Sequence, residues 1–561
     1  MKINFINAKL SSIAIAIIAF VGINLVASFL YLRYDLTSEK RYTLSRNTKE
    51  LLRSLDKSVR IEIYLDGELN SGFRLLAKST REMADEMEVL SGIHLRYEFI
   101  DVASVKDEDK KPLLKMLSER KMDPIPVFET LEDGSKKQTQ VYPYMVMKMG
   151  DKELVVNLLE NLPGLSGSEN LNKSIEVLEF KFTDAIRRLK SDVKPKVAFL
   201  EGHGELDEYD VMDVTHQLSQ YYQVERGSIQ QDASVLSDYK CVIVAAPTAP
   251  FSEKDKFILN QYVMNGGSVL WLVDGLALSL DSLQERSTSI GLPLDLNLDD
   301  MLFKYGFRIN RVTVQDIQCA MIPVNVAKIG EAPKFVPAPW MFNPLLLPAQ
   351  NSPITKSINV VKGEFVSTID SVGEDNGLKR KVLLASSRFS KISKPPVMVS
   401  LFSVNEKPKK EEFTHSFLPV AMVAEGEFPS LFEFRASPVG VSNVQKAVSV
   451  GKSTKMILVA DGDLIRNEVR FKESNPQIIP LGYDEVNHQT YGNKDFIVNS
   501  VNYLADDGGW MALRNRSNVL RLLDKAKVAE DALFYKLLNV VTPLVLLILL
   551  GIGYNFYRKR G

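Results

Sequence analysis

Two long apolar runs, one near each end of the sequence, constrain this chain most strongly. Residues 10–32 and residues 537–557 contain no Asp, Glu, Lys or Arg. A helix of about 20 apolar residues, rising about 1.5 Å per residue, is long enough to cross the hydrocarbon core of a bilayer. The sequence therefore predicts a protein anchored in a membrane by a transmembrane helix at 10–32 and a second one at 537–557.

Basic residues predict the orientation of both helices. Lys2 and Lys9 lie in residues 1–9, and the tail 558–561 is also basic. Because Lys and Arg near a span stay on the cytoplasmic side, both termini are expected in the cytoplasm of a bacterium. The roughly 500 residues between the runs are then expected in the periplasm, on the outer side of the inner membrane. A cleaved signal peptide is the alternative for the first run, but the run is longer than the usual apolar region of about 7–15 residues.

Composition excludes several classes of function. The 561 residues have a formal net charge of −1, so the concentrated positive charge of a nucleic-acid-binding protein is missing. The sequence has two cysteines, no C-x-x-C and five scattered histidines, which argues against a zinc site or a thioredoxin-type redox site. Cys241 lies in an apolar run and is interpreted as a core thiol. A disulfide with Cys319 is not expected, although an oxidising compartment would permit it.

The first outer segment, 34–192, is predicted to be a thioredoxin-like α/β domain. Alternating strands at 59–65 and 93–101 flank a helix at about 72–90, and this order predicts a parallel pair with a right-handed crossover. A hairpin is expected to turn at Gly150–Asp151. The domain lacks the cysteines that thioredoxin chemistry needs.

A helix at about 171–189 leads to Pro195, which is interpreted as a domain boundary. Alternating strands and helices follow, as in a doubly wound α/β sheet. This domain is expected at 195–290 and again at 451–510. The weakly patterned segment 291–450 is interpreted as a β-rich insertion with short strands and loops. The smaller elements are expected as strands at 196–200, 223–228, 239–246 and 268–275, helices at 208–221, 252–266 and 493–504, and a juxtamembrane helix at 511–536.

A candidate ligand-binding site follows the first strand of this second domain. Glycines after a strand and before a helix let backbone N–H groups face a ligand, and α/β sheets bind ligands at the carboxyl ends of their strands. Two aspartates end later strands of the same sheet. The candidate residues are Gly202, His203, Gly204, Glu205, Asp274 and Asp461. The alternative is a tight turn in which Glu205 interacts with the positive end of a helix dipole.

Catalysis is not expected. After the strand 241–246 the chain continues with Pro247-Thr248, where a nucleophile elbow would carry Ser or Cys. The segment 449–454 contains Gly-Lys-Ser but precedes a strand, so it is not a phosphate-binding loop. We predict no enzymatic activity, no metal and no cofactor.

Long blocks of the sequence resemble one family across nearly the whole chain. These blocks include RYTLSRNTKELLRSL (41–55), VAFLEGHGELDEYDV (197–211), PTAPFSEKDKFILNQYVMNGGSVLWLVD (247–274), LDLNLDDMLFKYGFRIN (294–310) with VQDIQC (314–319), and ILVADGDLIRN (457–467). Together with the two terminal runs, they resemble the GldG family, the auxiliary or substrate-binding-type subunits of ABC transporters associated with gliding motility.

The resemblance implies an inner-membrane protein that works with a separate ABC permease and a separate cytoplasmic ATPase, in gliding and the associated type IX secretion. It also implies a class I glutamine amidotransferase-like fold for the central domain, without the catalytic Cys. It assigns no ligand to any residue. A periplasmic scaffold that binds protein or cell wall without moving a solute, and a hydrolase with an unrecognised site, remain the alternatives.

Overall fold

A computed structural model describes most of the chain outside the first apolar run. The described residues are 20, 22, 43–130, 135–162, 165–325, 334–373, 377–405, 408–444, 448–472, 475–515, 528 and 530–560. The chain forms two compact units, Met1–Arg516 and Ser517–Gly561, and each is treated by itself. Apart from Phe20 and Gly22, the predicted span 10–32 lies outside the described residues.

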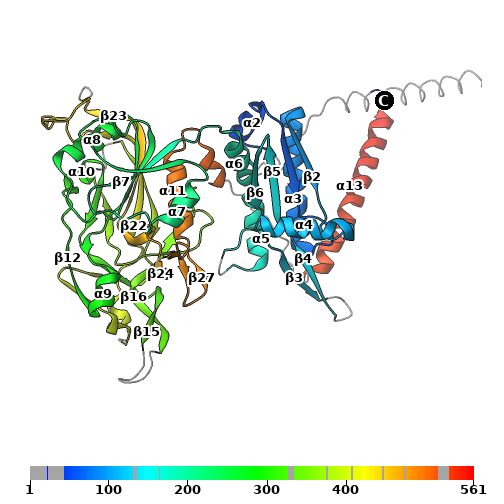
Figure 1. The fold of residues 1–561 in the computed structure, drawn as a ribbon. Helices are drawn as coiled ribbons and strands as arrows, with labels where there is room; N and C mark the ends of the chain where they lie inside the picture. Colours follow the sequence, from blue (N-terminus) through cyan, green and yellow to red (C-terminus); the bar gives the residue numbers. More distant parts are fainter. Residues whose placement is uncertain are drawn as a thin grey trace, which may run out of the picture. The chain divides into compact units, whose positions relative to one another are not determined.

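The first part of the larger unit is a four-stranded sheet with helices, and its strand order is β2-β1-β5-β6 (Figure 1). The predicted parallel pair is confirmed, because β1 and β2 run parallel and flank α3. The predicted hairpin is confirmed as well, because β5 and β6 pair antiparallel around Gly150, which has φ 57°. The thioredoxin-like assignment remains a prediction. The elements are α2 (Arg46–Arg53), β1 (Val59–Ile63), α3 (Ser71–Ser91), β2 (Leu95–Phe99), α4 (Asp107–Glu119), β3 (Ile125–Thr130), β4 (Lys136–Val141), β5 (Tyr144–Met149) and β6 (Lys152–Asn157).

The predicted helix 171–189 is two helices, and this part of the prediction is wrong. α5 (Gly167–Glu176) begins at a capping box formed by Ser166 and Glu169, and α6 covers Leu178–Lys190. The chain leaves the helical conformation at Val177, where ψ is 2°. Neither Gly nor Pro marks this break, so local sequence does not reveal it. α5 packs on α3, whereas α6 packs on β5 and β6.

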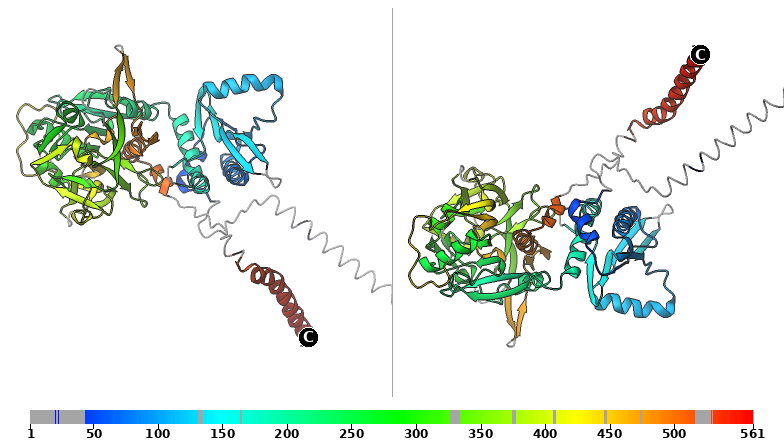
Figure 2. Two further views of the ribbon diagram at one scale, coloured as in Figure 1. Left: turned by 90° about the horizontal axis from the view of Figure 1, so that it is seen from below. Right: turned by 90° about the horizontal axis from the view of Figure 1, so that it is seen from above.

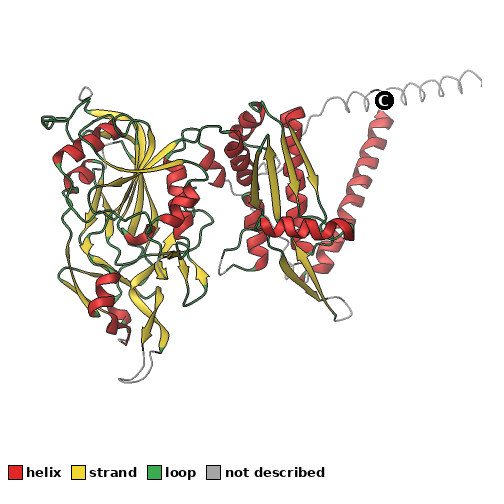
Figure 3. Cartoon of the chain, viewed as in Figure 1, coloured by secondary structure: helices red, strands yellow, loops and turns green. Residues whose placement is uncertain are grey.

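The central domain is built on a sheet that has ten strands within the described residues, shown as yellow arrows in Figure 3. Five of these strands, in the order β8-β7-β9-β10-β23, run parallel. They are β7 (Lys196–Glu201), β8 (Gln223–Ser228), β9 (Tyr239–Ala245), β10 (Ser268–Leu272) and β23 (Val450–Val459). The Gly-Lys-Ser segment lies in β23, which agrees with its rejection as a phosphate-binding loop.

Both faces of this sheet are covered. Alternate residues of β9 enter two different cores: Cys241 and Ile243 pack in one, and Val242 and Val244 in the other. Such a buried strand is a continuous apolar run rather than an alternating one. The first core includes residues of α7 (Met212–Leu218) and α11 (Asn493–Leu504), and the second includes residues of α8 (Glu253–Met264). The α/β class is thus confirmed.

The segment 291–450 is rich in strands, and several of them extend the same sheet, whereas others form small sheets of two or three strands. β22 pairs antiparallel with β23, and β19, β16 and β15 continue the sheet beyond it. The prediction of short strands is wrong for β16, which has 14 residues. Its prolines are tolerated because part of the strand pairs only with the edge strand β15, where Pro337 faces Pro323. These strands are β15 (Cys319–Asn325), β16 (Phe335–Pro348), β19 (Lys379–Ala385) and β22 (Pro419–Pro429).

Smaller elements complete this domain. A hairpin of β24 and β25 projects from it in both views of Figure 2, where it is orange. The cysteines of this domain, Cys241 and Cys319, form no disulfide with each other. The smaller elements are β11 (Leu276–Ala277), α9 (Leu280–Arg286), β12 (Thr288–Pro293), α10 (Asp299–Lys304), β13 (Phe307–Asn310), β14 (Thr313–Asp316), β17 (Val361–Lys362), β18 (Thr368–Ser371), β20 (Ser390–Ser393), β21 (Val397–Ser400), β24 (Val469–Lys472), β25 (Asn475–Ile478), β26 (Tyr483–Asp484), β27 (Gln489–Thr490) and the 3-10 helices η3 (Leu401–Asn405), η4 (Lys410–Glu412), η5 (Asp463–Ile465) and η6 (Trp510–Asn515). A further 3-10 helix, η1 (Gly92–His94), connects α3 to β2 in the first part of the larger unit.

The smaller unit contains one long apolar helix, α13 (Ala532–Arg560). Its segment Ala532–Arg558 is long and apolar enough to cross a membrane, with a mean hydropathy of 2.2. The predicted span 537–557 lies inside it. The predicted juxtamembrane helix 511–536 is corrected at its start, since Trp510–Asn515 is a 3-10 helix. Most of its remainder lies outside the described residues.

Candidate functional site at the carboxyl edge of the central sheet

The order of the strands reverses at β7, because the chain adds β8 on one side of β7 and then β9 on its other side. Parallel α/β sheets bind ligands at such a reversal, between the carboxyl ends of the two strands. Here the loops after these strands are bonded directly to each other. The carbonyl oxygen of His203 accepts hydrogen bonds from the backbone N–H groups of Thr248 and Ala249, each at 2.8 Å. The Thr248 hydroxyl donates to the carbonyl oxygen of Gly204 at 3.1 Å. The two glycines have positive φ, 118° for Gly202 and 72° for Gly204, so the turn depends on them.

His203 lies buried inside this turn between two carboxylates. Its Nδ1 is 3.0 Å from Glu205 Oε1, and its Nε2 is 3.3 Å from Asp255 Oδ2. The ring stacks on Phe251 with a centroid distance of 3.6 Å. Asp255 is also held by the hydroxyl of Ser252, the N-cap of α8, at 2.6 Å. Both ring nitrogens are therefore occupied by side chains of the protein.

These contacts set the protonation state of His203. Burial alone would lower its pKa, but the hydrogen bonds to Asp255 and Glu205 outweigh burial and raise the pKa to about 9. Burial opposes ionisation of Asp255 too, yet its bonds to His203 and Ser252 hold its pKa below the usual value. At neutral pH the imidazole is thus charged and paired, and it has no free lone pair to act as a base.

Asp274 and Asp461 lie in a second group on the same edge, after β10 and β23. Asp274 Oδ1 accepts a hydrogen bond from the backbone N–H of Gly462 at 2.7 Å, and Asp461 Oδ2 accepts one from Glu364 at 2.9 Å. Burial raises the pKa of Asp274 to about 6. The hydrogen bond from the backbone of Gly462 lowers this pKa, and the negative charge of Glu364 raises it. Burial and the charge of Asp274 raise the pKa of Asp461. Because the negative charges of neighbouring carboxylates repel one another, these carboxyl groups do not all ionise, and they share the remaining protons.

The two groups are connected by close backbone packing. A Cβ at Gly462 would lie 2.4 Å from Asp274 Oδ2 and 2.7 Å from the Cβ of Ala246, so only glycine fits there. Ala246 follows β9 with φ 50°, a strained conformation directly before Pro247-Thr248, where a nucleophile elbow would carry Ser or Cys. The structure therefore brings all six predicted residues to one edge of the sheet, in two groups.

Arg466, which was not among the predicted residues, is the centre of an ion-pair network beside the second group. Arg466 lies 3.1 Å from Asp210 and 3.0 Å from Asp281, and it also approaches Asp463. Burial raises the pKa of Asp463, as do the charges of Asp274 and Glu364, while Arg466 lowers it. The motif Asp461-Gly-Asp-Leu-Ile-Arg466 carried this signal, since acidic residues beside an Arg at a strand end predict an ion-pair network.

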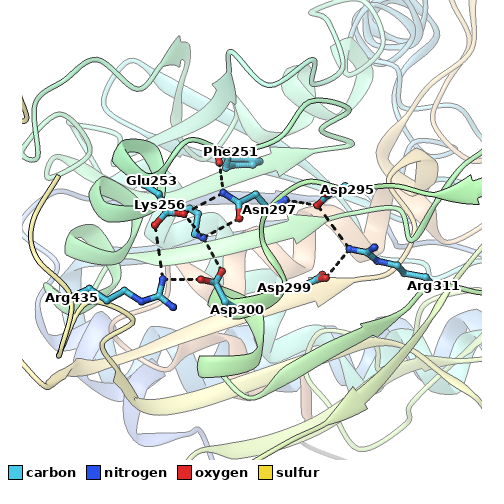
Figure 4. A network of polar contacts seen from close by, with 9 residues as sticks. All are labelled: Phe251, Glu253, Lys256, Asp295, Asn297, Asp299, Asp300, Arg311 and Arg435. Atoms are coloured by element: carbon cyan, nitrogen blue, oxygen red, sulfur yellow. Dashed lines mark hydrogen bonds and ion pairs between the residues drawn. The ribbon is translucent and has the colours of Figure 1, made fainter. Parts of the chain in front are cut away.

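A third polar group surrounds the buried amine of Lys256 on α8 (Figure 4). Its Nζ lies 2.9 Å from Glu253 Oε1 and 2.8 Å from Asp300 Oδ1. Asp300 also binds Arg435 at 2.8 Å. Because each charge is paired, this network is a connection between α8 and the segments around 300 and 435. The i,i+3 spacing of Glu253 and Lys256 was its signal in the sequence.

A hollow lies beside Asp274. It is lined by leucines of the segment 294–302 and by Asp299 and Arg311, which pair at 2.7 Å. Its volume of about 20 Å³ has room for about one water molecule. Among the described residues, no group of three or more His, Cys, Asp or Glu side chains is arranged to hold a metal ion. The polar side chains at this edge of the sheet are thus ion pairs and carboxyl groups that share protons.

Comparisons with known proteins give a family for the central domain. Residues 194–500 match the model of a family described as an ABC-type uncharacterized transport system. Residues 38–148 match a domain of unknown function, DUF7088. No curated protein matches the chain. A solved structure titled "mmIFT52 N-terminal domain" covers 48% of this chain and 88% of its own, at 13% identity and a TM-score of 0.28.

Proposed function

Because this chain belongs to the family described as an ABC-type uncharacterized transport system, we propose that it is a non-catalytic auxiliary subunit of an ABC transporter. It is anchored in the bacterial inner membrane with its bulk in the periplasm and both termini in the cytoplasm. It works with a separate permease and a separate cytoplasmic ATPase in gliding motility and the associated type IX secretion. The family match over residues 194–500 is the observation that carries this proposal.

Two further observations support a non-catalytic role at the membrane. The helix Ala532–Arg558 is long and apolar enough to span a bilayer. At the candidate site, the imidazole of His203 is paired on both nitrogens, and Ala246 provides only a methyl group at the strained turn after β9. Covalent catalysis needs a nucleophile beside a free base, and an imidazole that is paired on both nitrogens is not such a base.

Affinity purification from the native membrane tests the proposal. A tagged full-length chain is expected to retain a permease and an ATPase after detergent extraction. Replacing both apolar runs by unrelated hydrophobic helices of equal length, with the basic flanks kept, is expected to reduce this co-purification sharply while the outer part folds. If neither subunit is retained by the unaltered chain, the transporter role is refuted. If the replacement changes nothing, the contact lies in the outer domains.

A scaffold that binds protein or cell wall without moving a solute is the second candidate. The direct bonds between the loops after β7 and β9 favour it, because they close the place where a solute would bind. A thermal-shift screen of solutes on the full-length chain separates the candidates, since a ligand of the native state raises the melting temperature. A solute hit that is lost in Asp274→Asn supports solute binding at this edge, whereas purification of a cell-wall or protein complex without any solute hit supports the scaffold.

A further inference from the structure

The carboxyl group of Asp461, just after β23, is buried with one of its oxygens unpaired. Asp461 is 0% exposed, and its Oδ2 accepts a bond from the backbone N–H of Glu364 at 2.9 Å. Within the part of the chain that the structure describes, its Oδ1 has no hydrogen-bond partner. An ionised carboxylate has only acceptor oxygens and is costly to bury without donors, whereas a protonated carboxyl group carries no charge. The surroundings of Asp461 therefore favour its protonated form.

Several other carboxyl groups surround Asp461, and the nearest are connected to it through the backbone. Asp274, just after β10, accepts a bond at 2.7 Å from the N–H of Gly462, which is the next residue after Asp461. Glu364 donates its own N–H to Asp461. In this carboxyl cluster the acidic groups outnumber the cations. Its members are Asp210, Asp274, Asp281, Glu364, Asp461, Asp463 and Asp484, with Lys362 and Arg466 as the cations and Tyr491 as a further titratable group.

The two cations of the carboxyl cluster already have other partners. Arg466 pairs with the two carboxylates described above, and Lys362 Nζ lies 2.9 Å from Glu364 Oε1. Neither Asp274 nor Asp461 has an ion pair with any Lys, Arg or His side chain that the structure describes. Ionisation of both groups would therefore place two unpaired negative charges beside each other, where they repel.

The carboxyl cluster exchanges protons with solvent at Asp274. This side chain lines the hollow of about 20 Å³, which has room for about one water molecule. Burial raises the pKa of Asp274 to about 6, and burial together with the charge of Asp274 raises the pKa of Asp461. Both pKa values lie above the usual value of about 4, so the folded state binds these protons more tightly than the unfolded state. By linkage, the protons stabilise the fold fully below about pH 4, and this contribution is lost as the pH rises through about 6.

We propose that the carboxyl cluster is a pH-sensitive switch, which holds the segment 461–466 on the carboxyl ends of β10 and β23 when protonated and loosens this segment when the protons dissociate. The segment contains only the single turn η5, and the bond from Gly462 to Asp274 attaches it to the end of β10. Packing is close there, since a Cβ at Gly462 would lie 2.4 Å from Asp274 Oδ2, so repulsion acts on the segment directly. Loosening it exposes the edge of the sheet where α/β folds bind ligands. The switch does not depend on the transporter role.

The test measures amide hydrogen exchange of the full-length chain in non-ionic detergent at pH 5.5 and pH 8, with rates corrected for the intrinsic effect of pH. Protection of the segment 461–466 in the unaltered chain is expected to fall roughly tenfold or more at pH 8. Asp461→Asn, which keeps the shape of the side chain without its charge, is expected to retain the protection at pH 8. Asp295→Asn, at an 82% exposed side chain, is the control that should behave like the unaltered chain.

Asp274→Asn is the second variant, and it keeps the test decisive if Asp461→Asn does not fold. Its amide oxygen can still accept the bond from Gly462, and protection at pH 8 is again expected to be retained. The proposal is overturned if the unaltered chain protects the segment equally at both pH values, or if the folded variants lose protection as the unaltered chain does. An equal loss of protection in β9 and β10 also overturns it, because the whole domain would then be destabilised.

Discussion

His203 has the contacts of a buried cation and not those of a catalytic base. Glu205 and Asp255 occupy its two ring nitrogens, and Phe251 covers one face of the ring. The raised pKa of about 9 means that the folded state binds this proton more tightly than the unfolded state, whose pKa is near 6.5. By linkage, the charged histidine stabilises the fold fully below pH 6.5, and this contribution is lost as the pH rises through 9.

The first prediction follows from this sign. At pH 6, His203→Gln should lower the free energy of unfolding by up to about 3 kcal/mol, because two buried carboxylates lose their cation. At pH 10 the difference from the unaltered chain should largely vanish, since the histidine is then neutral. Denaturant unfolding at both pH values measures it. A difference that is the same at pH 6 and pH 10 would show that the ring acts by packing and not by charge.

The second prediction concerns the turn glycines. Gly204→Val should destabilise the central domain by about 2 kcal/mol or more, because a β-branched side chain is strained at φ 72°. Its Cβ would also lie 2.1 Å from Thr248 Oγ1. The matched control is Gly227→Val on the neighbouring strand β8, where no atom lies within 4 Å of the added Cβ. Equal melting temperatures for the two variants would contradict the argument.

The 3-10 helix η6 packs on α6, an element of the first domain of the larger unit. Trp510 stacks on Phe180 of α6 at 5.3 Å with an interplanar angle of 14°. The guanidinium of Arg187 lies 3.9 Å from the centre of the Trp510 ring. Stacking and cation–π contacts of a buried tryptophan each contribute about 1 kcal/mol beyond the buried area. This short 3-10 helix therefore depends on α6 for its position.

The third prediction is that Trp510→Ala destabilises the larger unit by about 3 kcal/mol, in the range found for large-to-small changes at buried aromatic residues. The emission of Trp271 and Trp340, which lie in other cores, reports the unfolding of this variant in denaturant. Phe471→Ala, at a side chain that is 71% exposed, is the control and should be nearly neutral. An equally small effect of Trp510→Ala would mean that η6 is held elsewhere.

The elements that the sequence predicted well are those with strong local signals. The strand at 223–228 and the helix at 493–504 have the predicted bounds. The turn glycines at 150, 202 and 204 have the positive φ that a turn uses. Asp274 and Asp461 were correctly placed on one edge, because strands of a parallel sheet end on the same side.

What the sequence could not predict depends on distant partners. The break at Val177 arises because α5 and α6 pack on different elements, and nothing local marks it. The partner of His203 on α8, Asp255, is 52 positions away. The 14-residue strand β16 was hidden by prolines that are harmless only beside an edge strand. In each case tertiary context overrides the local pattern.

At the scale of the whole larger unit, the linker between the two domains is exposed, while the side-chain contacts across it are partly buried. Val193 in this linker is 82% exposed. Across the boundary, Tyr221 donates to Asp184 at 3.2 Å and Arg188 to Gln220 at 2.9 Å. The domains are thus joined by side chains as well as by the chain itself.

The fourth prediction is that cutting this linker does not separate the domains. A protease site placed at Val193 in the full-length chain should be cleaved readily, and the two fragments should still elute together in detergent. Adding Trp510→Ala should weaken the association and release a fraction of the fragments. Full separation after cleavage of the otherwise unaltered chain would contradict the proposed strength of these contacts.

One hydrogen bond described by the structure has a mechanical consequence. Asn47, near the start of the larger unit, donates to the carbonyl oxygen of Gly508, near its end, at 3.0 Å. The described part of the larger unit therefore begins and ends at nearly the same point. A force that pulls residues 43 and 515 apart acts first on this bond and on the neighbouring Trp510 stack. Those contacts are expected to break before either sheet bears the force. Their rupture would therefore protect the fold of both domains from tension between the two ends.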